Sequence, residues 1–402
     1  MVDLCLFFRV SEFNRLNNYR VYDIGKNQNY FDEKFIEDTI SQTGYDVYIN
    51  LNNYLAELFD KHQDKFKIVF SINGITLEHM KKYAPFVLDS FVQLVKRGNV
   101  EFVLEPYYNS LSSIYSKDEF EYQIVKQNEA IKDFFGVEPK IFRDSGFVFS
   151  NDLVDLYSQL GIKEVILSSN KKLSSNENEN FVFGSSKGDL KLLFENKQFS
   201  NELLNLKDIV SVSNLADRVV NDDGQIVSLF VDYKQLGDSN LEYFGDFVSK
   251  IINEGSCFIF PTQIMSNVSI VEQIDVPNLI SSHKSSSVKH ILGNRLQESA
   301  QEKLYEIEKM LKDHNDENIL ENWRRLSSIK NCFWMNVDDH FTGELDNYFE
   351  NPYDAYVYFM NALNDIVLRV RLKEEKIRFE EMLAKKDEEK IEVDELKNLI
   401  YE

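Results

Sequence analysis

The sequence is poor in proline, glycine and cysteine. Its 402 residues include 6 prolines, 15 glycines and 3 cysteines. So few prolines and glycines exclude a collagen-like, mucin-like or low-complexity chain. With 43% hydrophobic and 28% charged residues, the composition is that of a globular protein rather than a disordered one. The length allows one large α/β domain of roughly 250 residues and a smaller module.

The three cysteines stand far apart, at Cys5, Cys257 and Cys332, and no CxxC motif or Cys/His cluster occurs. This spacing argues against a structural zinc site. We therefore expect reduced, mostly buried thiols, no bound metal and no other cofactor.

Long apolar runs and an excess of basic residues are also lacking. No stretch of about 20 apolar residues could span a bilayer. The start, MVDLCLFFRVSEFN, has no basic region and too short an apolar run for a signal peptide, so we expect a cytoplasmic location. The net charge of −22 repels phosphate backbones and anionic membranes, which argues against both as partners.

Short apolar runs alternate with longer helical patterns as far as about residue 275. Such runs are typical of parallel strands buried on both faces and joined by right-handed helical crossovers. Seven strands favour a TIM-type barrel, complete or incomplete, over an open sheet, and no GxGxxG or P-loop follows any of them. The predicted strands are Leu4–Val10, Lys67–Ile72, Val100–Leu104, Lys140–Asp144, Glu164–Ser168, Ile226–Val231 and Cys257–Pro261. The clearest predicted helices are Asp46–Asp64, Thr76–Arg97 and Lys117–Phe135.

The remainder of the chain has a helical pattern. We predict a barrel over residues 1–275, a helical domain over 276–372 and a charged helical tail over 373–402. Because no sustained heptad appears, a solvated or frayed helix is the simpler interpretation of the tail. A coiled-coil partner site is the alternative. The few apolar points that we single out in the tail are Phe379, Leu383, Leu396 and Ile400.

Acidic and aromatic residues follow several predicted strands. In a βα barrel, functional side chains come from the C-terminal ends of the strands and the loops after them. Aromatic rings cover the apolar faces of a pyranose, and carboxylates accept hydrogen bonds from its hydroxyls, so these ends suit sugars. A lone Asp at a strand end is a structural cap at least as often. The segments are Ser11-Glu12-Phe13, Glu105 to Ser110, Asp144 to Phe147 and Asp232 to Asp238.

Together these segments resemble glycoside hydrolase family 57, the α-amylase and 4-α-glucanotransferase family. The resemblance runs through LCLFFRVSEFN, FSINGITLEHMKKYAPFVLDSF, EFVLEPYYNSL, FFGVEPKIFRDSGFVFSNDL, SLFVDYKQLG, IDVPNLI, LGNRLQESAQEKLYEIEK and NPYDAYVYFMNAL. It implies an incomplete (β/α)7 barrel followed by a helical domain, with an α-glucan or maltooligosaccharide as ligand. It also implies a retaining mechanism with a Glu nucleophile and an Asp acid/base.

The nucleophile motif of the family departs here at its key position. Phe-Arg-Asn-Thr-Glu-Leu in the family corresponds to Phe142-Arg143-Asp144-Ser145-Gly146-Phe147 in this chain. Retaining hydrolysis needs two carboxylates, one of which attacks the anomeric carbon, and Gly146 has no side chain with which to do so. Asp144 is the best substitute, but two residues of strand displace it by about 6.6 Å.

Other positions implied by the resemblance match only in part. Asp232 corresponds to the acid/base in DYKQLGDS, and Ser239 replaces the final His of that motif. Ser11-Glu12-Phe13 stands for His-Gln-Pro, Asn109 for a His, and Ser282 for a Trp. The resemblance places the substrate-binding positions at Ser11, Glu12, Glu105, Tyr107, Tyr108, Asn109 and Tyr233.

Three hypotheses about function follow. The first is a non-catalytic α-glucan-binding or regulatory relative of the amylases, because the scaffold segments match while several site positions depart together. The second is an active glycosidase or glucanotransferase that uses Asp144 or another carboxylate. The third is a structural or assembly partner that acts through the helical domain and the charged tail.

Overall fold

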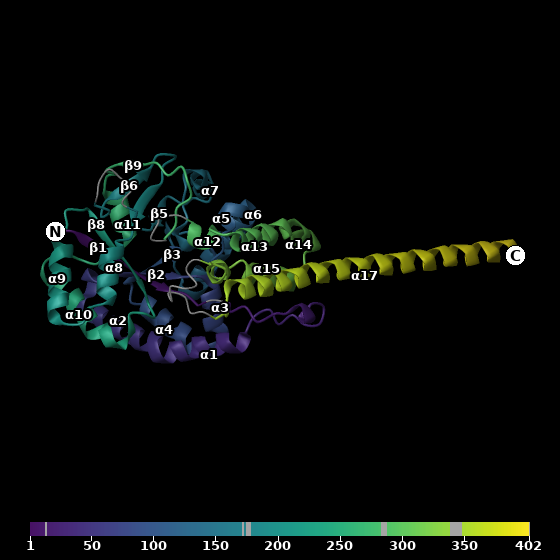
Figure 1. Cartoon of the computed structure of the whole chain (residues 1–402), viewed down its shortest axis with the longest axis horizontal. Helices are drawn as coiled ribbons and strands as arrows, with labels where there is room; N and C mark the ends of the chain where they lie inside the picture. The colour runs from purple at the N-terminus through teal and green to yellow at the C-terminus, as the bar shows by residue number, and fades with distance from the viewer. Residues whose placement is uncertain (13, 171–172, 174–177, 283–287, 338–347, 402) are drawn as a thin grey trace.

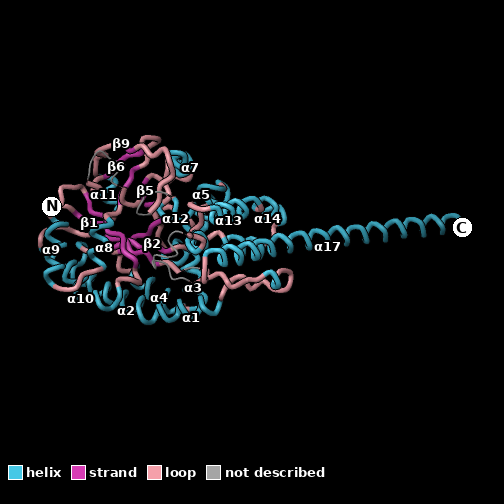
Figure 2. The backbone as a smooth tube through the Cα atoms, viewed as in Figure 1, coloured by secondary structure: helices cyan, strands magenta, loops and turns pink. Residues whose placement is uncertain are grey.

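A curled nine-stranded sheet with helices around it forms one end of the molecule (Figures 1 and 2). The computed structural model describes all residues except 13, 171–172, 174–177, 283–287, 338–347 and 402. The strands are β1 (Asp3–Val10), β2 (Ile68–Ile72), β3 (Val100–Leu104), β4 (Ile141–Phe142), β5 (Glu164–Leu167), β6 (Val182–Ser185), β7 (Lys191–Phe194), β8 (Ile226–Asp232) and β9 (Gln273–Ile274).

Seven of the strands are parallel neighbours in the order β8-β1-β2-β3-β4-β5-β7. The edge strands β6 and β9 follow β7, with β6 antiparallel to it. No ladder joins β8 to β7 among the described residues, but the Asn196 N–H donates to the Ser228 carbonyl at 2.7 Å. The barrel is therefore curled almost to closure without a continuous seam, which is the predicted incomplete (β/α)7 architecture.

Alternate residues of each strand enter two different cores. In β1, Cys5 and Phe7 pack in a cluster with Val69 of β2, Val103 of β3 and other residues of the barrel interior. The residues between them belong to the largest cluster, which lies between the sheet and the surrounding helices. This alternation follows from the period of two along a strand, and it explains why the strand sequences are apolar almost without interruption.

Five predicted strands and a sixth, short one are confirmed, and the seventh is wrong. Cys257–Pro261 makes only a single bridge, between Phe258 and Leu4, and continues into a helix that begins at Pro261. The seventh parallel strand is instead β7, a four-residue segment that was not predicted from the sequence. Lys140–Asp144 contains a strand of only two residues, β4, because Asp144 already caps the following turn.

The helices around the barrel begin and end at recognisable signals. Ser116 accepts a hydrogen bond from the Glu119 N–H at the start of α6, and Gly136 ends that helix in the left-handed conformation at φ 72°. The predicted helix Thr76–Arg97 is wrong as a single element, because Pro85 starts a second helix there. The helices of this part are α1 (Glu33–Thr43), α2 (Ile49–His62), α3 (Gly74–Tyr83), α4 (Pro85–Val95), α5 (Ser112–Tyr115), α6 (Lys117–Phe135), α7 (Val154–Gln159), α8 (Lys197–Leu204), α9 (Ile209–Val220), α10 (Gly237–Asn253) and α11 (Pro261–Asn267).

The remaining helices form a helical region that packs against the barrel. They are α12 (Lys289–Leu292), α13 (Arg295–Glu306), α14 (Glu308–His314), α15 (Glu317–Leu326), α16 (Ile329–Trp334) and α17 (Pro352–Tyr401). The first part of α17 packs against α13, α15 and α16, and its second part projects far from the body (Figure 1). No helix in the described ranges has both the length and the apolar character that crossing a membrane requires.

Candidate functional site

A ring of polar side chains closes the barrel interior at the C-terminal ends of its strands. Each member stands two residues beyond an interior apolar residue of its own strand, so the pleat turns it to the same inner side. The ring comprises Arg9, Ser71, Glu105, Arg143, Ser168, Glu195 and Asp232. Five of these residues, all except Ser168 and Glu195, lie in segments that resemble the family. The resemblance predicts a sugar site at this end of the barrel, and that assignment stays a prediction.

Asp232 lies at the end of β8 beside Arg9 of β1, its partner in register. Arg9 donates to Oδ2 of Asp232 at 2.9 Å. Oδ1 accepts the backbone N–H groups of Lys234 and Gln235 at 3.1 and 3.2 Å. Both oxygens therefore have donors from the chain itself. The pair remains partly exposed, with 24% of the Asp232 side chain and 44% of the Arg9 side chain accessible.

Glu105 and Arg143 form a buried ion pair across the same ring. Ser71 donates a hydrogen bond to the other oxygen of Glu105 at 2.7 Å. The Arg143 guanidinium lies over the rings of Phe147 and Phe230, 5.2 and 5.8 Å from their centroids. These contacts fill the centre of the barrel end with protein side chains and engage Glu105 on both oxygens.

Glu195 is a ring residue that was not predicted from the sequence. It follows β7 directly and is buried; Ser168 donates to its carboxylate at 2.7 Å, and the Lys197 ammonium lies 3.9 Å away. Burial raises the pKa of the Glu195 carboxyl, against the opposing attraction of the Lys197 ammonium. The run KLLFE, with an acid directly after three apolar residues, is the signal that could have revealed it.

Asp144 turns out of the ring and lies against α7. Its carboxylate accepts the Ser145 N–H and the Tyr157 hydroxyl, each at 2.7 Å. Burial raises the pKa of Asp144 to about 6, and the hydrogen bonds only partly oppose that shift. The Asp144 side chain is almost fully buried, so its carboxyl is shielded from a ligand in the barrel end.

Gly146 occupies a left-handed turn immediately after β4, with φ 63° and ψ 16°. A Cβ placed there would lie 2.9 Å from Cδ1 of Ile329 and 3.8 Å from Cδ1 of Ile291, in the helical region. The Gly146 carbonyl accepts the Ser282 N–H at 2.9 Å. Any side chain at this position would therefore start against apolar atoms of α12 and α16.

The predicted positions after β1, and Tyr233, are hydrogen-bonded to segments of the surrounding helices. Glu12 is buried, accepts the Tyr48 hydroxyl at 2.9 Å, and has its pKa raised by that burial. Ser11 accepts from Asn73 at 3.4 Å. Tyr233 is fully buried and donates to the Asn52 side chain at 2.6 Å.

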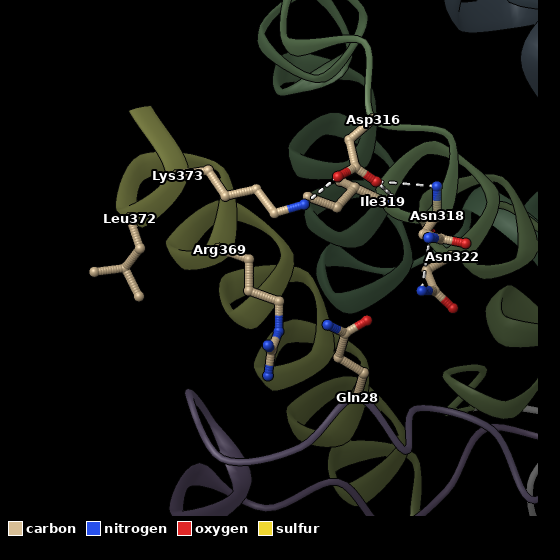
Figure 3. Close-up of a pocket in the computed structure, with 8 residues that line it drawn as sticks. All are labelled: Gln28, Asp316, Asn318, Ile319, Asn322, Arg369, Leu372 and Lys373. Atoms are coloured by element: carbon tan, nitrogen blue, oxygen red, sulfur yellow. Dashed lines mark hydrogen bonds and ion pairs between the residues drawn. The ribbon is translucent and has the colours of Figure 1, made fainter. Parts of the chain in front are cut away.

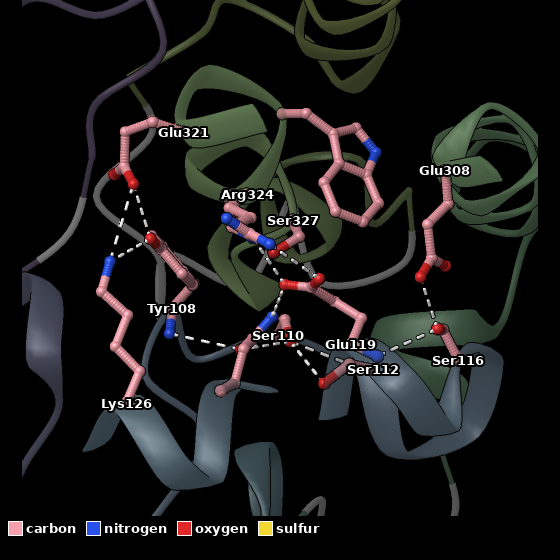
Figure 4. A network of polar contacts seen from close by, with 12 residues as sticks. Tyr108, Ser110, Ser112, Ser116, Glu119, Lys126, Glu308, Glu321, Arg324 and Ser327 are labelled. Carbon is pink, nitrogen blue, oxygen red and sulfur yellow. Dashed lines mark hydrogen bonds and ion pairs between the residues drawn. The ribbon is translucent and has the colours of Figure 1, made fainter. Parts of the chain in front are cut away.

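The segment after β3 packs on the helical region (Figure 4). The Tyr107 and Tyr108 rings are buried, and their hydroxyls donate to Glu78 and Glu321 at 2.5 and 2.6 Å. Asn109 adopts φ 52° and its carbonyl accepts the Ile329 N–H at 2.8 Å. Tyr108 and Asn109 therefore join the barrel to the helical region, whereas Tyr107 bonds Glu78 of α3. The assignment of these residues to sugar binding stays a prediction.

A buried ion pair holds the same interface together. Glu119 of α6 is fully buried and accepts the Nε of Arg324 of α15 at 3.0 Å (Figure 4). Lys312 of α14 lies 3.5 Å from the other Glu119 oxygen. Burial raises the pKa of Glu119, and these cations oppose the shift.

Two further observations concern the cavities of the structure and the possibility of a metal site. Five cavities on the described surface have volumes of about 320 to 840 Å³, and none of the five is lined by Asp232, Glu105 or Arg143. No three His, Cys, Asp or Glu side chains among the described residues are placed to hold a metal ion. Phe13 lies outside the described residues, and so does the side chain of Ser239.

Comparison with known proteins places this arrangement in a family. The model of glycosyl hydrolase family 57 matches residues 14–277. A candidate alpha-amylase of Methanocaldococcus jannaschii is 24% identical over an alignment of 418 residues. The alignment covers 95% of this chain and 88% of that protein. The branching enzyme of Pyrococcus horikoshii has a similar fold, with a TM-score of 0.64, 10% identity, and coverage of 90% of this chain and 88% of the other. An alpha-amylase from Thermotoga maritima gives a TM-score of 0.60 and 10% identity, with 94% and 95% coverage. The chain therefore belongs to glycosyl hydrolase family 57.

Proposed function

We propose that this chain is a non-catalytic member of the family that binds an α-glucan at the C-terminal end of the barrel and serves a binding or regulatory role. Gly146 carries the proposal. It stands where the motif has the nucleophile, and its Cα–Cβ direction leads to Ile329 at 2.9 Å. Formation of a glycosyl ester needs a carboxylate at this point, and the backbone supplies none.

The nearby carboxylates are poor substitutes. A pKa of about 6 would suit Asp144 to general acid catalysis, and this is the one observation that favours an active enzyme. However, its carboxylate is buried and accepts hydrogen bonds from Tyr157 and Ser145. Glu105 is paired with Arg143 and hydrogen-bonded by Ser71. Either group would have to break these contacts before it could attack an anomeric carbon.

Asp232, which the resemblance assigns to the acid/base position, accepts hydrogen bonds at both of its carboxylate oxygens. Asp232 accepts Arg9 on one oxygen and two backbone N–H groups on the other. A general acid must direct its proton at the leaving oxygen in the transition state, and these donors occupy both oxygens instead. Its role in this proposal is to orient Arg9, and the lone pair of Oδ2 that Arg9 leaves free accepts a hydrogen bond from a sugar hydroxyl.

The case for an α-glucan ligand rests on family membership and on the exposure of one pair. The relatives and structural neighbours named above include alpha-amylases and a branching enzyme. Arg9 and Asp232 are the partly exposed members of the polar ring, and together they offer donors and acceptors to hydroxyl groups.

Calorimetry tests the proposal. Wild-type protein is titrated with maltooligosaccharides, with β-linked cellooligosaccharides as the ligand control. We expect binding of the α-linked series alone, and at least a tenfold loss in Arg9→Ala. Arg218→Ala is the matched control, because it also breaks an Arg–carboxylate pair, with Glu202, but on the α8–α9 surface. Absence of binding at millimolar maltooligosaccharide, or equal loss in both variants, would refute an α-glucan site at Arg9.

A further inference from the structure

The end of α17 is a helix without a protein surface to rest on. Its buried residues stop at Val370, the last of a series that packs on the helical region. From Arg371 to Lys386 every side chain except that of Glu374 is exposed. An ion pair joins Lys373 to Asp316 of the body at the start of α15 (Figure 3). Beyond it the helix projects into solvent (Figure 1).

The projecting part carries large apolar side chains. Leu372, Phe379 and Met382 are 52%, 60% and 61% exposed. At 100° per residue they fall on one side of the helix, within about 80° of one another. Local pairs such as Lys376 with Glu380, 3.8 Å apart, help the helix but give no reason for an exposed Phe and Met. An apolar stripe of this kind is stabilised when another helix covers it.

The charges along the tail indicate which helix would cover the apolar stripe. Residues 373–386 carry five basic and four acidic residues, a net charge of +1. Residues 387–402 carry two basic and seven acidic residues, a net charge of −5. Two copies of this tail are complementary when they run antiparallel, since each +1 half then faces a −5 half. A parallel pair would place the two −5 halves together.

The body of the protein favours the same arrangement. Residues 1–372 carry −18, which is the chain total of −22 less the −4 of residues 373–402. A parallel pair would bring two such bodies to the same end. An antiparallel pair separates them by about 45 Å, the length of 30 helical residues, which exceeds the Debye length of about 8 Å at physiological salt.

We infer that the C-terminal part of α17 docks on the same segment of a second copy of this chain, and that the two helices form an antiparallel coiled coil. The apolar stripe of Leu372, Phe379 and Met382 lies in the contact. The partner is the chain itself, and the inference is independent of sugar binding.

The mass of the full-length chain in solution tests this inference first. At about 10 μM, sedimentation should give twice the 47.2 kDa of one chain. Phe379→Glu should shift the protein to the monomer, with an unchanged melting temperature of the body. Ile377→Glu is the matched control: Ile377 is 50% exposed on the same helix but about 200° around it from Phe379. It should remain a dimer. A monomeric wild type, a larger oligomer, or a dimer that survives Phe379→Glu would overturn the inference.

Cross-linking tests the direction. Leu372 and Lys386 lie on the same side of the helix, about 40° apart. In an antiparallel pair that overlaps over residues 372–401, Lys386 meets the Lys386 region of its partner, whereas Leu372 meets the far end. With Cys257→Ser as background, Lys386→Cys should form an interchain disulfide and Leu372→Cys should not. Disulfides in both variants would establish a parallel pair and refute the antiparallel one.

Discussion

A Cβ at Gly146 would lie 2.9 Å from Cδ1 of Ile329, so this glycine faces the helical region of the fold. In the proposed function, the absence of a carboxylate at this position and the packing of α16 are coupled. The helical region occupies the direction in which a side chain from this turn would leave the backbone.

Gly146→Ala should destabilise the protein by more than its left-handed backbone alone requires. A non-glycine residue at φ 63° costs about 1 to 2 kcal/mol, and the contact with Ile329 adds to that cost. Gly161→Ala is the matched control, since Gly161 has φ 75° and no atom lies within 4 Å of the position that its Cβ would take. Urea denaturation measures both variants. Equal losses of unfolding free energy in the two variants would mean that the Ile329 side chain moves aside at no energetic cost.

Gly146→Glu alone should not create an α-glucan hydrolase. The carboxylate would enter against Ile329, and Asp232 would still be held by Arg9. Electrostatic preorganisation contributes much of an enzyme's rate, and a single new side chain does not supply it. Turnover near the enzyme median of about 10 s⁻¹ would instead show that the rest of the site is intact.

Asp144 should make stability depend on pH. Burial raises its folded-state pKa to about 6 from an ordinary 3.8, so the folded protein binds a proton that the unfolded chain releases. That contribution is fully present below about pH 3.8 and is lost as the pH rises through about 6. It amounts to about 3 kcal/mol. Relative to Asp144→Asn, wild type should therefore lose stability between pH 4 and pH 7.

The second variant for this test is Tyr157→Phe. The Tyr157 hydroxyl donates to the ionised Asp144, so its removal should raise the Asp144 pKa further and move the transition to higher pH. If the stability difference between wild type and Asp144→Asn stays flat across this range, Asp144 does not titrate as described.

Arg324→Ala should destabilise the joint between the barrel and the helical region by about 3 to 5 kcal/mol. It would leave Glu119 fully buried, with Lys312 at 3.5 Å as its remaining cation. Arg218→Ala, which breaks an exposed pair, should lose at most about 1 kcal/mol. Chemical denaturation compares the two, and similar losses would contradict a structural role for the buried pair.

The sequence predicted the architecture better than the direction of individual side chains. Long apolar runs such as that of β1 identified buried parallel strands. The short strand β7 was not predicted, and the apolar segment Cys257–Pro261 was predicted as a strand but forms only a single bridge. That last segment is anchored by single hydrogen bonds rather than by a ladder. Strand periodicity identifies what is buried, and only pairing decides what is a strand.

The same limit applies to the site. The motif placed Asp232 at a strand end correctly, but nothing local indicated that Arg9, 223 positions away, would bind it. Tyr107 and Tyr108 have the character of sugar-binding aromatics in the sequence, and in the fold their buried rings pack with Ile75 of α3 and Ala130 of α6. The direction of an aromatic side chain depends on which helices or strands, distant in the sequence, pack against it in the fold.

The most direct test of non-catalysis is the release of reducing sugar from maltooligosaccharides, measured side by side for wild type and Asp232→Asn. Extended incubation at several pH values includes the range around 6, where Asp144 changes charge. The account predicts no release above the buffer blank from either protein. Release by wild type that disappears in Asp232→Asn would show a working acid/base at β8, and the non-catalytic function would be wrong.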